Sequence, residues 1–166
     1  PADIIQIHDA MPLSEIAQVK KAFPAAKIIK AMHVPRSGEP FDLGTLLAQA
    51  VELASQPFVD GLLLDTANPA RDQIGGTGLT NDWGAARAII DRVHEATGKP
   101  VALAGGLNPQ NASAAMDATG ADLLDANTGF RLDPAGSAAK DPAAILSVLE
   151  QMKGKVSRYF HKLGAS

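Results

Sequence analysis

The run Gly61-Leu62-Leu63-Leu64-Asp65-Thr66 decides the fold of this 166-residue chain. An uninterrupted apolar run indicates a strand that is buried on both faces, as the strands of parallel sheets are. Asp65 stands at the end of this strand, so its carboxyl group would emerge at the rim of the sheet. The loop that follows is long and contains Gly75-Gly76-Thr77-Gly78, which is typical of a mobile lid or an anion-binding loop.

The rest of the chain alternates strand and helix patterns around that central strand. Strands are predicted at 3–8, 26–34, 59–65, 100–104 and 121–126, and a helical pattern follows each of them. Five strand–helix units predict an α/β domain with a parallel sheet and helices outside it. The predicted helix starts are Pro12, the caps Asp42 and Asp82, Asn108-Pro109 and Asp141-Pro142.

The positions of the glycines distinguish two parallel architectures. An open doubly wound sheet calls for a glycine-rich turn after its first strand, whereas here glycines follow the third, fourth and fifth strands. A barrel carries polar residues and glycines at the carboxyl ends of many strands. We therefore predict a TIM (β/α)8-barrel type of fold, present as a partial barrel of about five parallel strands with outer helices. This domain would span residues 1–152, and 153–166 would form a basic C-terminal tail.

Composition excludes several classes of function. With 15 Lys and Arg against 18 Asp and Glu the chain has no basic field for nucleic acid, and with no cysteine it has no disulfide and no thiol nucleophile. No apolar run approaches the ~20 residues of a membrane helix, and Pro1 does not open a basic and apolar leader, so a cytoplasmic location without membrane contact is expected. No spacing of His, Asp and Glu indicates a metal, and we predict no cofactor.

Asp65 and two glycine pairs are the strongest candidates for a site. A carboxyl group at the mouth of an apolar strand is partly desolvated, which favours the protonated form that a general acid needs. Gly105-Gly106 would let backbone N–H groups approach an anion, with the start of a helix nearby, and Thr128-Gly129 would add a second such turn. The alternatives are that Asp65 only orders its loop and that the glycines only make tight turns.

His8 and Lys30 are weaker candidates. His8 leaves the first strand at the same end as Asp65 leaves the third, so it could line a pocket or merely hydrogen-bond its own loop. Lys30 could neutralise a carboxylate of a ligand, or it could be buried against a carboxylate of the protein such as Asp65.

A set of short motifs carries a family resemblance. The motifs are Gln6-Ile7-His8, Lys30-Ala31, Leu62-Leu63-Leu64-Asp65-Thr66, Gly75-Gly76-Thr77-Gly78, Asp82-Trp83, Leu103-Ala104-Gly105-Gly106-Leu107-Asn108-Pro109, Asn111, Asp125, Thr128-Gly129 and Lys140-Asp141. In this order and spacing they resemble the phosphoribosylanthranilate isomerase family, the barrel enzymes of tryptophan biosynthesis. The resemblance extends to about residue 150 and is most specific between residues 61 and 111.

The resemblance implies an Amadori rearrangement of N-(5-phosphoribosyl)anthranilate to the 1-deoxyribulose phosphate. It implies that Asp65 is the general acid, that backbone amides at Gly105, Gly106, Thr128 and Gly129 hold the substrate phosphate, and that Asp125 matches a further acidic residue on the last strand. The family's base is a Cys at the end of the first barrel strand, and it has no counterpart in this chain.

The length of the chain departs from the family. A complete barrel typically needs ~250 residues and rarely fewer than ~200, so 166 residues cannot hold eight strand–helix units. The resemblance implies that this chain corresponds to the family's barrel from the fourth strand onward. A five-stranded fragment would expose two sheet edges. We therefore expect self-association, or a further N-terminal segment that completes the barrel, and no stable monomer. The alternatives to an isomerase are a non-catalytic sugar-phosphate-binding or assembly relative that has lost the Cys base, or another phosphosugar enzyme on the same fold.

Overall fold

A computed structural model describes residues 2–66, 82–133 and 138–153 of the protein. Five strands and five α-helices alternate along this part of the chain, with one 3-10 turn before the last helix. In chain order the elements are β1 Ile4–Ile7, α1 Leu13–Ala22, β2 Lys27–Val34, α2 Leu43–Ser55, β3 Gly61–Thr66, α3 Trp83–Thr97, β4 Val101–Leu103, α4 Ala112–Thr119, β5 Leu123–Leu124, η1 Thr128–Phe130 and α5 Pro142–Gln151.

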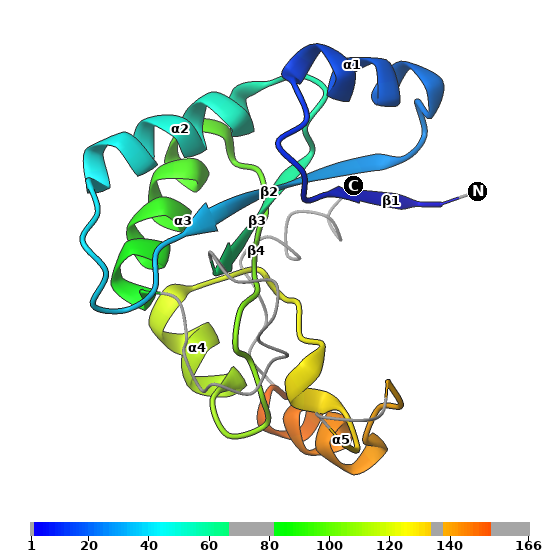
Figure 1. The fold of residues 1–166 in the computed structure, drawn as a ribbon, viewed down its shortest axis with the longest axis vertical. Coiled ribbons are helices and arrows are strands. Elements are labelled where there is room, and N and C mark those ends of the chain that lie inside the picture. Colours follow the sequence, from blue (N-terminus) through cyan, green and yellow to red (C-terminus); the bar gives the residue numbers. More distant parts are fainter. Residues whose placement is uncertain (1, 67–81, 134–137, 154–166) are drawn as a thin grey trace.

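The strands form one parallel sheet in the order β1-β2-β3-β4-β5, so each strand pairs with its neighbours in sequence. Helices follow the strands and lie along the outside of the curved sheet, and α2 contacts α3, α3 contacts α4, and α4 contacts α5 (Figure 1). This arrangement confirms the predicted α/β fold with parallel strands and outer helices. The last two strands are shorter than the predicted ranges 100–104 and 121–126.

Three of the predicted helix caps are confirmed. Asp42 accepts a hydrogen bond from Gly44 N, Asp82 from Ala85 N, and Asp141 from Ala143 N, which satisfies N–H groups that have no partner within their own helix. The predicted start of α4 at Asn108-Pro109 is wrong, because α4 begins at Ala112. Asn108 nevertheless caps the turn before it, since its Oδ1 accepts from Gln110 N and Asn111 N.

The hydrophobic core lies mainly between the sheet and its helices. Alternate strand residues such as Ile28, Leu62, Leu64 and Val101 are fully buried in one cluster with apolar residues of the outer helices. A smaller apolar cluster occupies the opposite face, which is the inside of the curved sheet, and consists of Ala31, Leu63, Ala102 and Ala104 with Ile29. The two clusters therefore identify which residues of each strand face the interior of the partial barrel.

Carboxylates secure the amino ends of two strands. Asp60 precedes β3 and accepts hydrogen bonds from Ile28 N at 2.9 Å and from Lys20 Nζ at 3.0 Å. Burial raises the pKa of Asp60, but these bonds and Lys27 outweigh it, so the pKa lies below its ordinary value. Asp122 precedes β5 and accepts from Val101 N at 2.9 Å. Both carboxylates thus join adjacent strands at the end of the sheet opposite Asp65.

Lys99 provides the first test of stability. Its Nζ donates to the carbonyl groups of Ala54, Gln56 and Val59 at 2.6–2.8 Å, where α2 ends and the chain turns toward β3. Burial lowers the pKa of Lys99, which the charge of Asp60 partly offsets. Because Lys99→Met removes three hydrogen bonds from a charged donor, and within the described residues Gln56 O alone is known to keep another partner, Val59 N, we expect it to lower the free energy of unfolding by about 1–3 kcal/mol.

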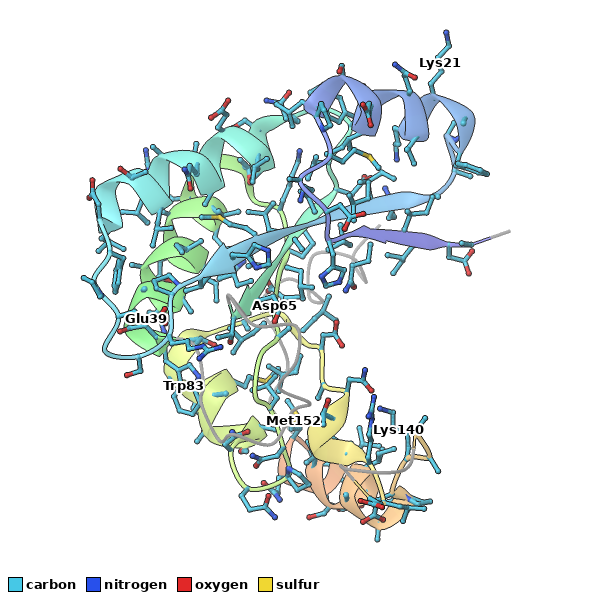
Figure 2. All side chains as sticks on the ribbon, in the orientation of Figure 1. Lys21, Glu39, Asp65, Trp83, Lys140 and Met152 are labelled. Carbon is cyan, nitrogen blue, oxygen red and sulfur yellow. The ribbon has the colours of Figure 1, made fainter. Side chains whose placement is uncertain are left out.

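Urea denaturation at a single protein concentration measures this loss, since association shifts apparent stability. Lys21→Met is the matched control, because Lys21 extends from the outer surface of α1 into solvent (Figure 2). An equal loss in both variants would show that the three carbonyl contacts of Lys99 are not the cause.

The two edges of the sheet carry exposed apolar side chains. Ile4 on β1 is 60% exposed, and Leu123 on β5 is 42% exposed. Leu146 and Leu149 of α5 are also exposed, at 62% and 58%. Within the described residues neither β1 nor β5 pairs with a strand on its outer side.

Among the helices of the described ranges, none is long and apolar enough to cross a membrane.

Candidate active site

The alternation of side chains along the strands brings four polar residues to the inner face. Asp65 has the same parity as Leu63 in β3, and His33 has the same parity as Ala31 in β2. On the edge strand β1, Ile5 and Ile7 pack against the helices, so Gln6 and His8 take the inner face. The sequence thus directs these four side chains to one side of the sheet, near its carboxyl end.

Asp65 lies at the carboxyl end of β3, near the centre of the molecule (Figure 2). Its side chain is 29% exposed, its Oδ1 accepts a hydrogen bond from Thr66 N at 2.8 Å, and its Oδ2 faces His8 Nδ1 at 4.0 Å. His33 is its partner in the β2–β3 register. No Lys or Arg among the described residues forms an ion pair with Asp65. Its carboxyl group is therefore held in place while one oxygen stays available to a ligand.

His8 and Asp125 are connected through Gln6. The Nε2 atom of Gln6 lies 2.6 Å from His8 Nε2 and 3.2 Å from Asp125 Oδ2. Asp125 follows β5, while Gln6 lies on β1 at the opposite edge of the sheet, so the sheet is curved enough for its two edge strands to share a hydrogen bond. Gln6 was not among the predicted site residues, although its spacing of two from His8 already places both on one face of a strand.

The Gly105-Gly106 turn follows β4. Both glycines have positive φ, at 91° and 64°, a conformation that side-chain-bearing residues rarely adopt. A Cβ at Gly105 would also collide with the side chain of Thr66. The amide group of Asn111 braces the turn, because Nδ2 donates to Gly106 O at 3.0 Å and Oδ1 accepts from Asn108 N at 2.8 Å. Within the described residues no acceptor is recorded for the N–H groups of Gly105 and Gly106.

Thr128-Gly129 begins the 3-10 turn η1 and lies directly against the preceding glycine turn. A Cβ at Gly129 would collide with Leu107 O and would lie 2.8 Å from Asn108 Cβ. Lys140 Nζ donates to both oxygens of Asn127, at 2.8 Å for the main-chain oxygen, and so anchors η1. In the described part of the chain the N–H groups of Thr128 and Gly129 likewise have no recorded acceptor. Two backbone turns with open donors therefore meet beside the ends of β4 and β5.

Lys30 lies away from these groups. It is 7% exposed and belongs to the helix-facing side of β2, where its Nζ donates to Ala31 O at 2.8 Å, Asp9 O at 3.0 Å and Ile7 O at 3.4 Å. Burial lowers the pKa of Lys30, and the charge of Asp9 partly offsets this. Lys30 thus lies on the helix-facing side of the sheet, where it neither faces the interior nor contacts Asp65.

Some of the predicted features lie outside the described residues. The loop Gly75-Gly76-Thr77-Gly78 lies outside the described residues, as does all of the predicted C-terminal tail except Lys153. Among the residues that the structure describes, no group of three or more His, Cys, Asp or Glu side chains is placed to hold a metal ion. The candidate site is therefore made of Asp65, the Gln6–His8–Asp125 group and the two backbone turns.

Comparison with protein families and curated relatives shows the family of this chain. The family model described as N-(5'phosphoribosyl)anthranilate (PRA) isomerase matches residues 1–151. N-(5'-phosphoribosyl)anthranilate isomerase 2 of Methanosarcina mazei is 33% identical over 152 residues, which is 90% of this chain and 59% of that protein. The chain thus spans about three fifths of the length of this relative.

Solved structures agree with the sequence match. Phosphoribosyl anthranilate isomerase from Thermococcus kodakaraensis superposes with a TM-score of 0.67 and 25% identity, over 92% of this chain and 64% of that one. Another isomerase structure, solved in complex with reduced 1-(o-carboxyphenylamino)-1-deoxyribulose 5-phosphate, has a TM-score of 0.60 and 23% identity, over 92% and 60% of the two chains, and supports the fold. The barrel-type architecture predicted from the sequence is thereby confirmed.

Proposed function

This chain belongs to the N-(5'-phosphoribosyl)anthranilate isomerase family, and we propose that it carries the general acid and the phosphate site of an enzyme that isomerises N-(5-phosphoribosyl)anthranilate. The observation that supports this most strongly is a shared rim. Asp65 lies at the carboxyl end of β3, and the two turns with open N–H groups follow the neighbouring strands β4 and β5. An acid and an anion site on one rim suit a substrate that carries a reactive sugar carbon and a phosphate.

The proposed reaction begins with Asp65. Its proton passes to the ring oxygen of the sugar while the lone pair of the anthranilate nitrogen forms a C1=N bond, and the bond from C1 to the ring oxygen breaks. A base then removes the proton from C2, and that electron pair forms a C1=C2 bond and returns the C1=N pair to nitrogen. Return of a proton to C1 and loss of the C2 hydroxyl proton give the ketone. No atoms are gained or lost overall, as an isomerisation requires.

Phosphate binding at the two glycine turns is supported by their geometry. Consecutive positive-φ glycines direct main-chain N–H groups outward, and the side chain of Asn111 holds that turn rigid. The amino end of α4 follows at Ala112 and adds its positive dipole. Gly105, Gly106, Thr128 and Gly129 would thus bind the phosphate by main-chain donors, while His8 and Asp125 would contact the rest of the substrate.

The base and the remainder of the barrel form the second part of the proposal. The chain contains no cysteine, spans 59% of its Methanosarcina relative and leaves β1 and β5 as sheet edges with exposed Ile4 and Leu123. An unpaired edge with apolar side chains favours pairing with further strands. We propose that a further segment, or a second copy of the chain, covers these edges. The base that acts on C2 would come from the further segment.

Complementation tests both parts of the proposal. The segment of the Methanosarcina relative that lies outside the match is co-expressed with this chain, and we call the resulting complex the complemented barrel. We expect the complemented barrel to convert the phosphoribosylanthranilate substrate, which is seen as a loss of substrate fluorescence. Neither piece alone should convert it. In sedimentation velocity this chain alone should associate. A folded complex without turnover would contradict the enzyme, and a well-folded monomer of this chain at micromolar concentration would contradict the partner.

A sugar-phosphate-binding protein without catalysis is the second candidate function. The two glycine turns favour it, because their main-chain N–H groups could bind a sugar phosphate without any base. This candidate predicts that inorganic phosphate raises the melting temperature of the complemented barrel, that Gly106→Asp abolishes the rise by placing a carboxylate in the turn, and that no substrate is converted. Turnover by the complemented barrel would exclude it.

A further inference from the structure

Gln6 occupies an unusual position between two other polar side chains of the inner face. Its Nε2 atom is within hydrogen-bond distance of both His8 and Asp125, at 2.6 Å and 3.2 Å. Gln6 and Asp125 are 119 residues apart. Gln6 lies on the edge strand β1 and Asp125 directly follows the edge strand β5, and these two strands do not pair with each other in the described structure. The glutamine therefore links two parts of the site that the backbone leaves separate.

Asp125 decides which way the amide group of Gln6 is turned. The oxygen and nitrogen of a glutamine amide are similar in size, so their assignment rests on the partners that they meet. A carboxylate offers only acceptors, and an amide oxygen placed against it would leave two acceptors in contact. The NH2 group of Gln6 must therefore face Asp125 Oδ2, as the structure has it.

The same NH2 group then decides where His8 carries its proton. An amide NH2 has two hydrogens to donate and nothing to accept with, so His8 Nε2 at 2.6 Å has to be the acceptor. A ring nitrogen that accepts a hydrogen bond carries no hydrogen, and the single proton of the neutral imidazole is left on Nδ1. His8 Nδ1 is the atom that faces Asp65 Oδ2, at 4.0 Å.

We propose that Gln6 is a positioning residue that holds His8 in its Nδ1–H tautomer and directs that N–H toward Asp65, with Asp125 fixing the orientation of Gln6. At 4.0 Å the N–H acts on Asp65 as an oriented dipole rather than as a hydrogen bond. If Asp65 is the acid of the proposed function, this dipole stabilises the carboxylate that remains after Asp65 has given up its proton. Only this last step rests on the proposed function, since the tautomer follows from the contacts of Gln6 alone.

Nuclear magnetic resonance tests the tautomer without any substrate. Long-range 1H–15N correlation spectra distinguish Nδ1–H, Nε2–H and doubly protonated rings, and His8→Gln identifies the His8 signals among those of the 4 histidines. In the complemented barrel at neutral pH we expect His8 to show the Nδ1–H pattern. Free histidine favours the opposite, Nε2–H tautomer, so the expected pattern is not the default of the side chain.

Variants of Gln6 separate positioning from packing. Gln6→Leu removes the donor at similar size and is expected to shift His8 to the Nε2–H pattern. Gln6→Glu replaces the donor by an acceptor and is expected to add a proton at Nε2. Gln18→Leu, on the exposed surface of α1, is the matched control and should leave the His8 signals unchanged.

The unsubstituted protein alone decides the assignment even if a variant does not fold. An Nε2–H or doubly protonated His8 in that protein would overturn the proposal, and so would an Nδ1–H pattern that survives Gln6→Leu in a folded variant. An Nδ1–H pattern in a protein without turnover would leave the positioning of His8 intact and count against the proposed enzyme. The two proposals therefore fail by different measurements.

Discussion

Replacing Asp65 with asparagine is expected to lower the kcat of the complemented barrel by about 10²–10⁴-fold, the usual contribution of a general acid. Asparagine keeps the size of the side chain and an oxygen that can accept from Thr66 N, so the geometry at the end of β3 is preserved. It cannot give a proton to the ring oxygen of the sugar. KM should therefore change little, because the loss falls on the transition state. The rate is followed by the loss of substrate fluorescence at saturating substrate.

Asp91→Asn is the control for this experiment. Asp91 lies on the outer surface of α3, where its Oδ2 pairs with Arg87 Nε at 2.7 Å, and an exposed pair of this kind contributes at most about 1 kcal/mol to stability. This variant should retain the kcat of the parent. If Asp65→Asn also retained it, the acid of the reaction would have to be another group.

The fold was predictable because its signals are local. The caps Asp42, Asp82 and Asp141 each act within three residues of the helix start, and the apolar runs of the central strands are continuous in the sequence. The start of α4 was not predictable in this way. Asn108 and Asn111 are equally good caps by residue type, and only the contacts of Asn111 with Asn108 N and Gly106 O show that a separate turn comes first.

The candidate site was predictable in its location and less so in its members. The resemblance and the strand ends both pointed to Asp65, whose place at the end of β3 agrees with them. Lys30 is a candidate from the sequence because its ammonium group could neutralise a carboxylate of a ligand, but a strand buried on both faces gives no sign of which side chains face the interior. The contacts of Lys30 with Ile7 O, Asp9 O and Ala31 O reveal the face, and they depend on how β1 and β2 pair.

Gly129→Ala is expected to weaken phosphate binding to the complemented barrel by about 10- to 100-fold, the loss of one or two hydrogen bonds to a charged group. The added Cβ would collide with Leu107 O and lie within 3.0 Å of Asn108 Cα and Cβ, so η1 and the turn after β4 must move apart. Overpacking of this kind also costs about 1–3 kcal/mol of stability. The rise in melting temperature with increasing phosphate concentration measures the affinity, because a ligand stabilises the state that binds it.

Gly98→Ala separates the loss of binding from the loss of stability. Gly98 ends α3 with φ at 67° and has no atom within 4 Å of the position a Cβ would take, so alanine there costs about 1 kcal/mol through the backbone conformation alone. It lies at the other end of the strand–helix units and should leave phosphate affinity unchanged. Since both variants are destabilised, a difference in their phosphate dependence can come only from the contact between the two turns. Equal phosphate affinity in the two variants would place the anion somewhere other than beside Gly129.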